Sequence, residues 1–139
     1  MRLSTKSRYA VTSLLDMVMN ADNAPVSLAE ISRRQGISLS YLEQLFAKMR
    51  RNNLVVSTRG PGGGYSLSCA PEDVSISDII SAVDEKVEVT NKDALPGVVS
   101  YEPCLTEQLW EELSEQISSY LNNISLADMI RNNDVELKH

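Results

Sequence analysis

Few residues of this sequence are suited to a disulfide framework, a zinc site or a catalytic triad. Its 139 residues include two cysteines, Cys69 and Cys104, and one histidine, His139, which is the last residue of the chain. Two separated cysteines are too few for a disulfide framework and lack the close pairing that usually announces structural zinc. No Ser/His/Asp or Cys/His arrangement can be assembled around His139. We therefore expect a protein that is not an enzyme.

Long apolar runs are also missing. No stretch approaches the roughly 18 consecutive apolar residues of a membrane span. The first residues lead directly into helix-like sequence instead of a signal peptide. These features predict a cytoplasmic protein without membrane contact. The apolar share of 42% is sufficient for a core, and the length suits one domain or a small module with an attached oligomerisation element.

Positive charge is scarce overall, because the formal net charge is -6, but it is unevenly distributed. Residues 1–69 hold nine Lys/Arg against four Asp/Glu, a net charge of +5, whereas residues 70–139 hold four against fifteen, a net charge of -11. A cationic segment can bind phosphates while an acidic remainder limits indiscriminate DNA binding. The alternative is an ordinary fluctuation of surface charge.

Capping residues and apolar spacing predict two helices in the first quarter of the chain. The first helix is expected from Ser4 or Thr5 to about Asn20. Ser27 and Glu30 have the spacing of a capping box, which predicts a short helix over residues 28–34.

A third helix follows after Gly36, which permits a sharp turn. Ser38 or Ser40 is expected to cap it, and the helix is expected to end near residues 51–53. Its apolar residues form one stripe, expected to face the core: Leu39, Leu42, Leu45, Phe46 and Met49. Helix, tight turn and helix together predict a helix-turn-helix motif.

A β-hairpin is predicted directly after this motif. Residues 54–59 and 65–69 are β-prone and flank the turn Gly-Pro-Gly-Gly-Gly at residues 60–64. This turn lacks the Lys-Ser/Thr ending and the following helix of a nucleotide-binding loop, so a wing turn is the better interpretation. The predicted fold is mostly α with a small β-hairpin, a winged helix-turn-helix.

The sequence of the second half of the chain predicts a long helix with an apolar face that needs a partner to cover it. A short helix capped by Ser77 is expected first, then a loop over residues 87–103, and a last short helix from Ser125 through Ile130. Between the loop and the last helix, a helix of about twenty residues has a wide apolar face. We predict that this face forms a homodimer interface through Leu105, Leu109, Trp110, Leu113, Ile117, Tyr120 and Leu121.

These elements divide the chain into three predicted regions. Residues 1–84 form the winged helix-turn-helix domain, residues 85–103 a sensor-like loop, and residues 104–139 the dimerisation helix with a C-terminal helix. We expect double-stranded DNA as the partner of the first region.

The polar face of the third helix contains residue types that can read bases. Gln44 can bond adenine, Ser40 can bond base or phosphate, and Glu43 can accept from cytosine. The alternative is an ordinary solvated face.

Several cations are suited to phosphate contact, namely Arg33, Arg34, Lys48, Arg50 and Arg51. Arg59 is placed to enter a narrow minor groove. The complete predicted DNA-binding set is Arg2, Lys6, Arg8, Ser27, Leu28, Arg33, Ser38, Ser40, Tyr41, Glu43, Gln44, Lys48, Arg51, Arg59 and Gly60.

Several stretches resemble a known bacterial family of winged-helix regulators that bind an iron-sulfur cluster. They are RYAV at residues 8–11, QGISLSYLEQLF at 35–46, RGPGGGY at 59–65, IISAVDE at 79–85, CLT at 104–106 and LNNI at 121–124. The resemblance covers nearly the whole chain. It implies a winged-helix DNA-binding domain, a long dimerisation helix, a palindromic operator and cluster-dependent control of iron-sulfur assembly genes.

The sequence departs from this family at the expected cluster ligands. The family holds a 2Fe-2S cluster with three cysteines and a histidine. By resemblance those positions fall at Lys92, Val98, Cys104 and Glu107, so Cys104 is the one ligand retained. A related branch uses a carboxylate where this chain has Arg8. We therefore expect no cofactor and no confident metal site.

The leading interpretation is a homodimeric, sequence-specific DNA-binding regulator whose cluster-sensing part has been lost or replaced. The nearest alternative is a working 2Fe-2S sensor with unusual ligands, such as Cys104 of both protomers plus Glu107. More remote is a winged helix that serves only as a protein-interaction module, which the pairs Arg33-Arg34 and Arg50-Arg51 disfavour.

Overall fold

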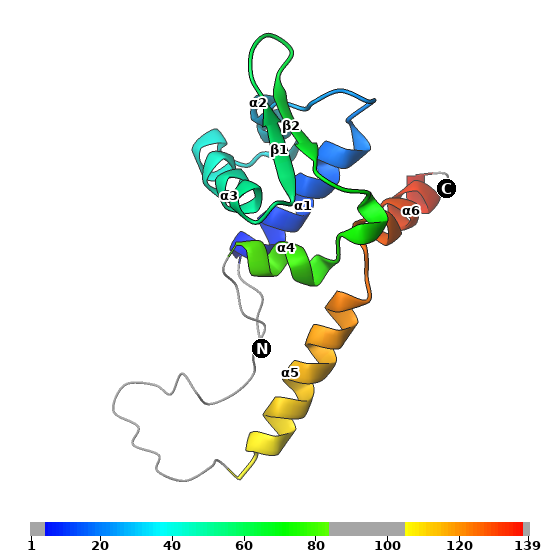
Figure 1. Ribbon diagram of the computed structural model, residues 1–139. Helices are drawn as coiled ribbons and strands as arrows, with labels where there is room; N and C mark the ends of the chain where they lie inside the picture. Colours follow the sequence, from blue (N-terminus) through cyan, green and yellow to red (C-terminus); the bar gives the residue numbers. More distant parts are fainter. Residues whose placement is uncertain (1–4, 84–104, 138–139) are drawn as a thin grey trace.

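The computed structural model describes residues 5–83 and 105–137 and has the predicted fold class (Figure 1). The described elements are α1 (Thr5–Met19), α2 (Leu28–Gln35), α3 (Leu39–Arg51), β1 (Val55–Thr58), β2 (Gly64–Leu67), the 3-10 helix η1 (Pro71–Asp73), α4 (Ile76–Ala82), α5 (Glu107–Asn122) and α6 (Leu126–Leu137). Helices α2 and α3 form the helix-turn-helix, and the hairpin β1–β2 is the wing. Within the described residues, no helix is both long and apolar enough to span a bilayer.

The caps of the helix-turn-helix are those that the sequence predicts. The amide of Glu30 donates to Ser27 Oγ at 3.2 Å, and the amide of Ser27 donates to Glu30 Oε2 at 3.3 Å. Gly36 ends α2 in the left-handed region with φ 68°, where glycine meets no steric penalty. Ser38, not Ser40, caps α3 and accepts from the amide of Tyr41 at 3.1 Å.

The wing is an antiparallel hairpin that is also attached to the start of α2. Val55 pairs with Leu67 and Thr58 pairs with Gly64. A third short segment joins the hairpin, because the amide of Val26 donates to the carbonyl of Tyr65 at 2.9 Å and the reverse bond measures 2.8 Å. A Cβ at Gly64 would lie 2.3 Å from the carbonyl oxygen of Val26, so this close approach requires glycine.

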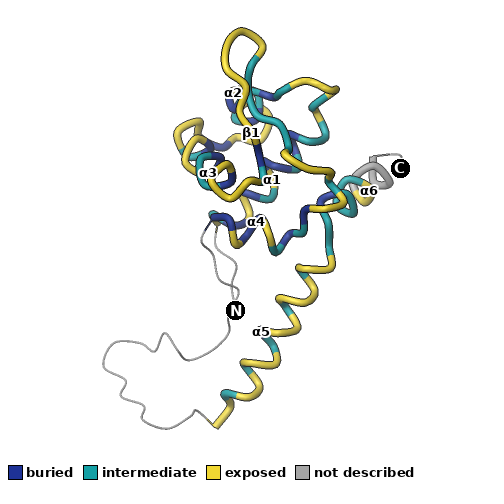
Figure 2. The backbone as a smooth tube through the Cα atoms, viewed as in Figure 1, coloured by how far each residue is buried: buried dark blue, intermediate teal, exposed yellow. Residues whose placement is uncertain are grey.

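Helix α5 extends away from the rest of the described chain and is largely exposed (Figures 1 and 2). It begins at Glu107 after the cap residue Thr106. The prediction that Leu105 lies on the helix is therefore wrong: it precedes the cap and its side chain is fully exposed.

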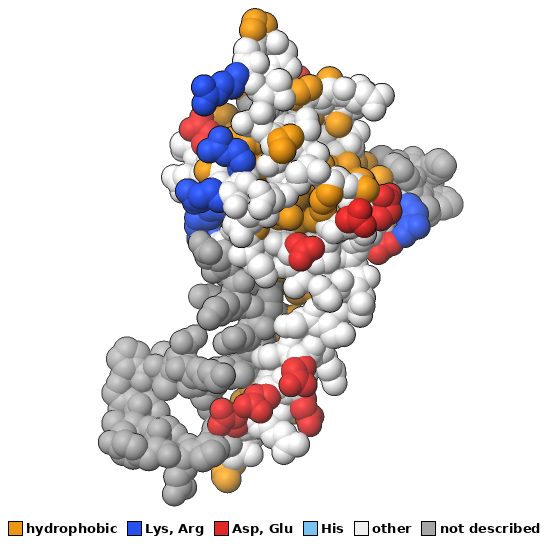
Figure 3. Space-filling model, in the orientation of Figure 1, with side chains coloured by type: hydrophobic (Ala, Val, Ile, Leu, Met, Phe, Trp, Pro, Cys, Tyr) orange, Lys and Arg blue, Asp and Glu red, His pale blue; other side chains and the backbone are white. Residues whose placement is uncertain are grey.

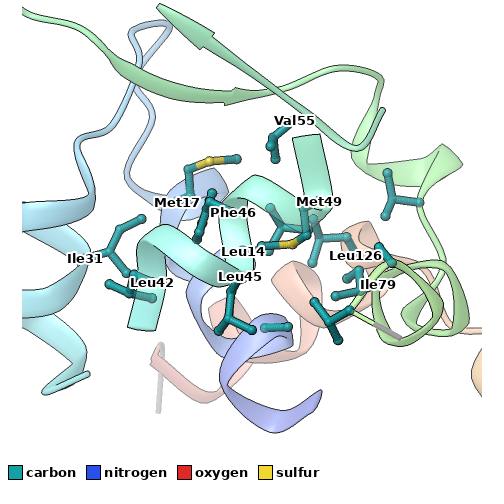
Figure 4. Packing of buried hydrophobic residues seen from close by; sticks show 14 of the residues in the cluster. Leu14, Met17, Ile31, Leu42, Leu45, Phe46, Met49, Val55, Ile79 and Leu126 are labelled. Carbon is teal, nitrogen blue, oxygen red and sulfur yellow. The ribbon is translucent and has the colours of Figure 1, made fainter. Parts of the chain in front are cut away.

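One core joins the two ends of the described chain. Buried side chains of α1, α2, α3, β1, α4 and α6 pack together (Figure 4): Leu14, Met17, Ile31, Leu42, Leu45, Phe46, Met49, Val55, Ile79 and Leu126. The predicted stripe of α3 is thus confirmed except at Leu39, which is 42% exposed. Leu39 lies at the first residue of the helix and at the edge of the stripe, where the packed helices do not cover it.

Helices α4 and α6 each begin with a capping box, and backbone hydrogen bonds join the two helix starts. The cap of α4 is Ser75 with Asp78, so the prediction of Ser77 is wrong; Ser77 lies inside the helix. Ser125 caps α6 together with Asp128, as predicted for Ser125. The amide of Ile76 donates to Ile124 at 2.9 Å and the amide of Leu126 donates to Val74 at 2.8 Å. The chain therefore returns to the core after α5, and α6 runs past the predicted end at Ile130 to Leu137.

Candidate nucleic-acid interface

The polar face of α3 points away from the core. Four buried apolar residues hold the opposite face of this helix in place, which leaves Ser40, Glu43, Gln44 and Arg51 exposed. Tyr41 and Lys48 are half-buried at the borders of the face. Lys and Arg side chains gather along the edge of the molecule that carries the wing and α3 (Figure 3). The structure thus brings the predicted base-reading residues onto one accessible surface.

The wing lies beside α3 and is packed against it. The ring of Phe46, buried on α3, contacts the ring of Tyr65 on β2 with centroids 5.1 Å apart. Arg59 is exposed where the hairpin begins its turn, and Gly60 has a φ of 96° that other residues rarely adopt. The aromatic contact therefore joins α3 to the hairpin that carries Arg59.

The N-terminal end of α3 is ordered by contacts with α1. Tyr41 meets Tyr9 of α1 edge to face, with ring centroids 5.8 Å apart and an interplanar angle of 88°. The hydroxyls of Ser38 and Ser40 lie 3.4 Å apart on the exposed side. Sequence spacing gave no sign of the pairing between Tyr9 and Tyr41, because the two residues lie on different helices.

The C-terminal end of α3 is held by an asparagine that the sequence analysis did not identify. The side chain of Asn52 donates to the carbonyl of Lys48 at 2.9 Å and to that of Ala82, at the end of α4, at 3.2 Å. Asn53 then turns the chain with φ 62°, and its carbonyl accepts from the hydroxyl of Ser68. Both ends of α3 are therefore fixed to neighbouring elements.

The other predicted DNA-binding residues differ in what they can offer. Arg8 and Arg33 are exposed and Lys6 is half-buried, so their cations face solvent at least in part. The Ser27 hydroxyl is engaged in the capping box. Leu28 is buried. Arg2 lies outside the described residues.

Arg34, expected to contact phosphate, binds Asp16 of α1. Its Nη2 donates to Asp16 Oδ1 at 2.7 Å and its Nε to Asp16 Oδ2 at 3.1 Å, a bidentate pair. Gln35 Nε2 donates to the same carboxylate at 2.7 Å. Asp16 is 6% exposed, and the hydrogen bond to it raises the pKa of Arg34 above its ordinary value. This network fixes the last turn of α2 directly before the turn to α3.

The apolar face of α5 has no cover over much of its length within the described chain. Leu109 is 55% exposed and Tyr120 is 67% exposed, whereas Leu121 packs against the core. Leu113 and Ile117 are half-buried between them, and Trp110 is half-buried with its indole Nε1 donating to Thr106 Oγ1 at 2.8 Å. Such a contiguous apolar surface is typical of an interaction site.

Three of the four expected cluster-ligand positions lie outside the described residues. They are Lys92, Val98 and Cys104, and the fourth, Glu107, is half-buried in the first turn of α5. In the part of the chain that the structure describes, no three His, Cys, Asp or Glu residues come together as a metal site would require. Of the residues that the resemblance places at the ligand positions, the valine has no donor atom and the lysine is a strongly hydrated cation.

The helix-turn-helix, the wing and the basic edge define a class, the winged-helix DNA-binding transcription regulators. The chain belongs to the Rrf2 family, whose model, described as an iron-dependent transcriptional regulator, matches residues 3–132. A putative HTH-type transcriptional regulator, ORF2 of Azotobacter vinelandii, is 57% identical over 136 residues, which are 98% of this chain and 83% of that protein. IscR of Yersinia enterocolitica is 52% identical over 135 residues, or 97% and 82% of the two chains.

Solved structures support the same assignment. T. potens IscR superposes with a TM-score of 0.77 at 36% identity and covers 96% of this chain and 88% of its own. CymR, described as the global cysteine regulator of B. subtilis, superposes with a TM-score of 0.79 at 28% identity, with 95% and 98% covered. The chain is therefore a DNA-binding transcription regulator that resembles IscR.

Proposed function

We propose that the chain acts as a homodimer on a palindromic operator, with α3 of each protomer in the major groove. The observation that carries this proposal is the exposed face of Ser40, Glu43 and Gln44 on a helix against which the wing packs. Gln44 reads adenine and Glu43 accepts from cytosine. Arg59 enters the adjacent minor groove and favours sequences in which that groove is narrow.

Phosphate contacts position the dimer without specifying sequence. The exposed cations Arg8, Arg33 and Arg51, with Lys6 and Lys48 at the borders, are the groups assigned to this role. The acidic face of α5 lies far from α3 (Figure 3), so its carboxylates do not oppose the DNA. We propose that this regulator works in the cytoplasm and has no enzymatic activity.

Removing either Gln44 or Arg59 should weaken specific binding. Gln44→Ala deletes a base contact and Arg59→Ala deletes a groove contact, and each should cost about 1 to 3 kcal/mol, or about 5- to 150-fold in affinity. Mobility-shift titration at fixed salt measures this on an operator selected in vitro from random duplex DNA. The control is Arg131→Ala on α6, which also removes one exposed cation but on the side of the molecule away from α3 (Figure 1). Wild-type affinity in both test variants would refute the assignment of α3 and the wing as readers.

We further propose that the protein holds no stable 2Fe-2S cluster and binds DNA equally before and after treatment with iron and sulfide. Support comes from the donor set, in which Cys104 alone is a thiolate. Glu107 lies three residues later, so the two can supply half a site per protomer. A complete site would need both protomers to combine their halves across the dimer axis, which is the second candidate function and agrees with the family's iron-dependent description.

Anaerobic reconstitution distinguishes these two functions. We expect iron well below one cluster per protomer or per dimer, no charge-transfer absorption in the visible range, and the same operator affinity in treated and untreated samples. Cys104→Ser is the matched variant and should give the same spectrum as the natural protein. Stoichiometric iron with visible absorption that is lost in Cys104→Ser would establish a cluster sensor with unusual ligands.

A further inference from the structure

Leu39 is the one residue of the apolar stripe of α3 that the core does not take up. Leu42, Phe46 and Met49 are completely buried and Leu45 nearly so, whereas Leu39 is 42% exposed and is not packed against the core cluster. Isolated exposed leucines are common on protein surfaces, so exposure alone carries no weight. The position of Leu39 does, because it is the first residue of the recognition helix.

The surroundings of Leu39 are polar and ordered. Ser38 and Ser40 flank it, both exposed, with their hydroxyls 3.4 Å apart. Ser38 caps the helix through the amide of Tyr41, and Tyr41 rests edge to face on Tyr9. A cap hydrogen bond and an aromatic contact therefore support the leading end of α3. In helix-turn-helix proteins, this end of the recognition helix contacts base edges in the major groove.

A leucine at this place can recognise one feature of the major groove. Base edges there present hydrogen-bond donors and acceptors, which the neighbouring serines, Glu43 and Gln44 can address, and a single apolar group, the C5-methyl of thymine. We propose that Leu39 is a specificity-determining residue that packs on a thymine methyl in each half-site. The proposal depends on the proposed insertion of α3 into the major groove.

The position of this thymine follows from helix geometry. Leu39 precedes Glu43 by four residues, about one turn or 6 Å along the helix, and the two lie on the same side of α3. Base pairs repeat every 3.4 Å. The thymine should therefore lie within about two base pairs of the cytosine that Glu43 is proposed to contact.

Deoxyuridine supplies the test, because it differs from thymidine only by the missing methyl group. An operator is selected by the wild-type protein from a random duplex library, and its thymines are then replaced symmetrically, one position of the half-site at a time. At one position the replacement should weaken wild-type binding about 4-fold per half-site, and about 15-fold with both half-sites changed, as expected for one buried methyl group each. Replacements at the other positions should change the affinity less than 2-fold, about 0.4 kcal/mol.

Two variants of Leu39 assign the effect to this side chain. Leu39→Ala should bind the thymine and deoxyuridine operators equally, with the affinity that the wild type shows for deoxyuridine. Leu39→Met keeps an apolar side chain and should keep the preference for thymine. Alanine and methionine are good helix formers. The thermal unfolding temperature and the affinity for non-specific DNA should therefore match those of the wild type.

The outcomes separate the two proposals. If the wild type selects a defined operator but no thymine responds to loss of its methyl, the Leu39 proposal is wrong while the proposed function stands. The same conclusion follows if Leu39→Ala remains sensitive to the methyl. If selection enriches no sequence at all, both proposals fail.

Discussion

Replacing Arg34 by alanine is expected to lower the free energy of unfolding by about 3 kcal/mol. The substitution leaves the Asp16 carboxylate, 6% exposed, with Gln35 as its remaining side-chain donor. Breaking a buried ion pair from one side costs about 3 to 5 kcal/mol, because the other charge stays buried without compensation. The lower end of that range applies here, since the Arg34 side chain is itself 33% exposed and Gln35 remains bound.

Urea denaturation followed by circular dichroism measures this loss, with all proteins at one concentration because association would add to apparent stability. Arg33→Ala is the matched control: Arg33 is the exposed neighbour on the same helix, and its removal should change stability by less than about 0.5 kcal/mol. In DNA affinity the order should reverse. Arg33→Ala should weaken DNA binding more than Arg34→Ala does, because loss of Arg33 removes a proposed phosphate contact.

A double-mutant cycle with Asp16→Asn shows whether the pair itself is responsible. Asp16→Asn removes the buried charge, so Arg34→Ala in that background should cost far less than it does in the natural chain. Equal costs in the two backgrounds would mean that Arg34 stabilises the protein through packing of its aliphatic part, without coupling to Asp16.

Local features of this fold were predictable from the sequence, because they depend on neighbours a few residues apart. The capping box of Ser27 and Glu30, the turn at Gly36 and the wing around residues 60–64 all belong to this kind. The cap of α4 was predictable in the same way, since Ser75 and Asp78 have capping-box spacing, and Ser77 was the wrong choice between two serines.

Contacts between elements were not predictable in this way. Asp16 and Arg34 are 18 residues apart, and Asn52 reaches Ala82 across 30 residues. Helical periodicity indicates which face of α1 turns inward, but it does not say that an aspartate on that face meets an arginine of α2. Periodicity also placed Leu39 in the core, because the pattern takes no account of where the packed helices end.

For the candidate site, the sequence predicted the residue types of the polar face of α3, and the structure brings Ser40, Glu43 and Gln44 onto one surface. The sequence alone could not distinguish a cation that is free to contact phosphate from one that binds a carboxylate of the same protein. Arg33 and Arg34 are adjacent and identical in the sequence, and both are exposed at least in part, yet Arg34 is bound to Asp16. That distinction depends on the packing of α1 against α2 and becomes visible in three dimensions.

The predicted homodimer leads to the second large effect. Leu113→Glu introduces a charge into the middle of the apolar face of α5, where it should prevent dimerisation. Each protomer loses the burial of a leucine, about 1.5 to 3 kcal/mol, and also has to bury a carboxylate, which costs several kcal/mol per ion. The dimer dissociation constant should therefore rise by at least about 1000-fold, or 4 kcal/mol.

Two further variants exclude simpler explanations. Ser119→Glu adds the same charge to an exposed position on the other side of α5, and it should leave the dimer intact. Leu109→Glu changes a residue that is 55% exposed within one chain, so it can disrupt an interface without damaging the protomer's own core. If Leu109→Glu and Leu113→Glu both give folded monomers, misfolding is not the cause.

Light scattering combined with mobility shifts tests the functional consequence. Half-sites of a palindrome lie about one helical turn apart, so two connected recognition helices are needed to occupy both. When the two recognition helices are connected in a dimer, binding at the second half-site becomes an intramolecular step. This raises the overall affinity by orders of magnitude. A monomeric Leu113→Glu protein should therefore bind a palindrome no more tightly than a single half-site, whereas Ser119→Glu should keep the full difference. A Leu113→Glu protein that stays dimeric in light scattering would place the interface on another surface.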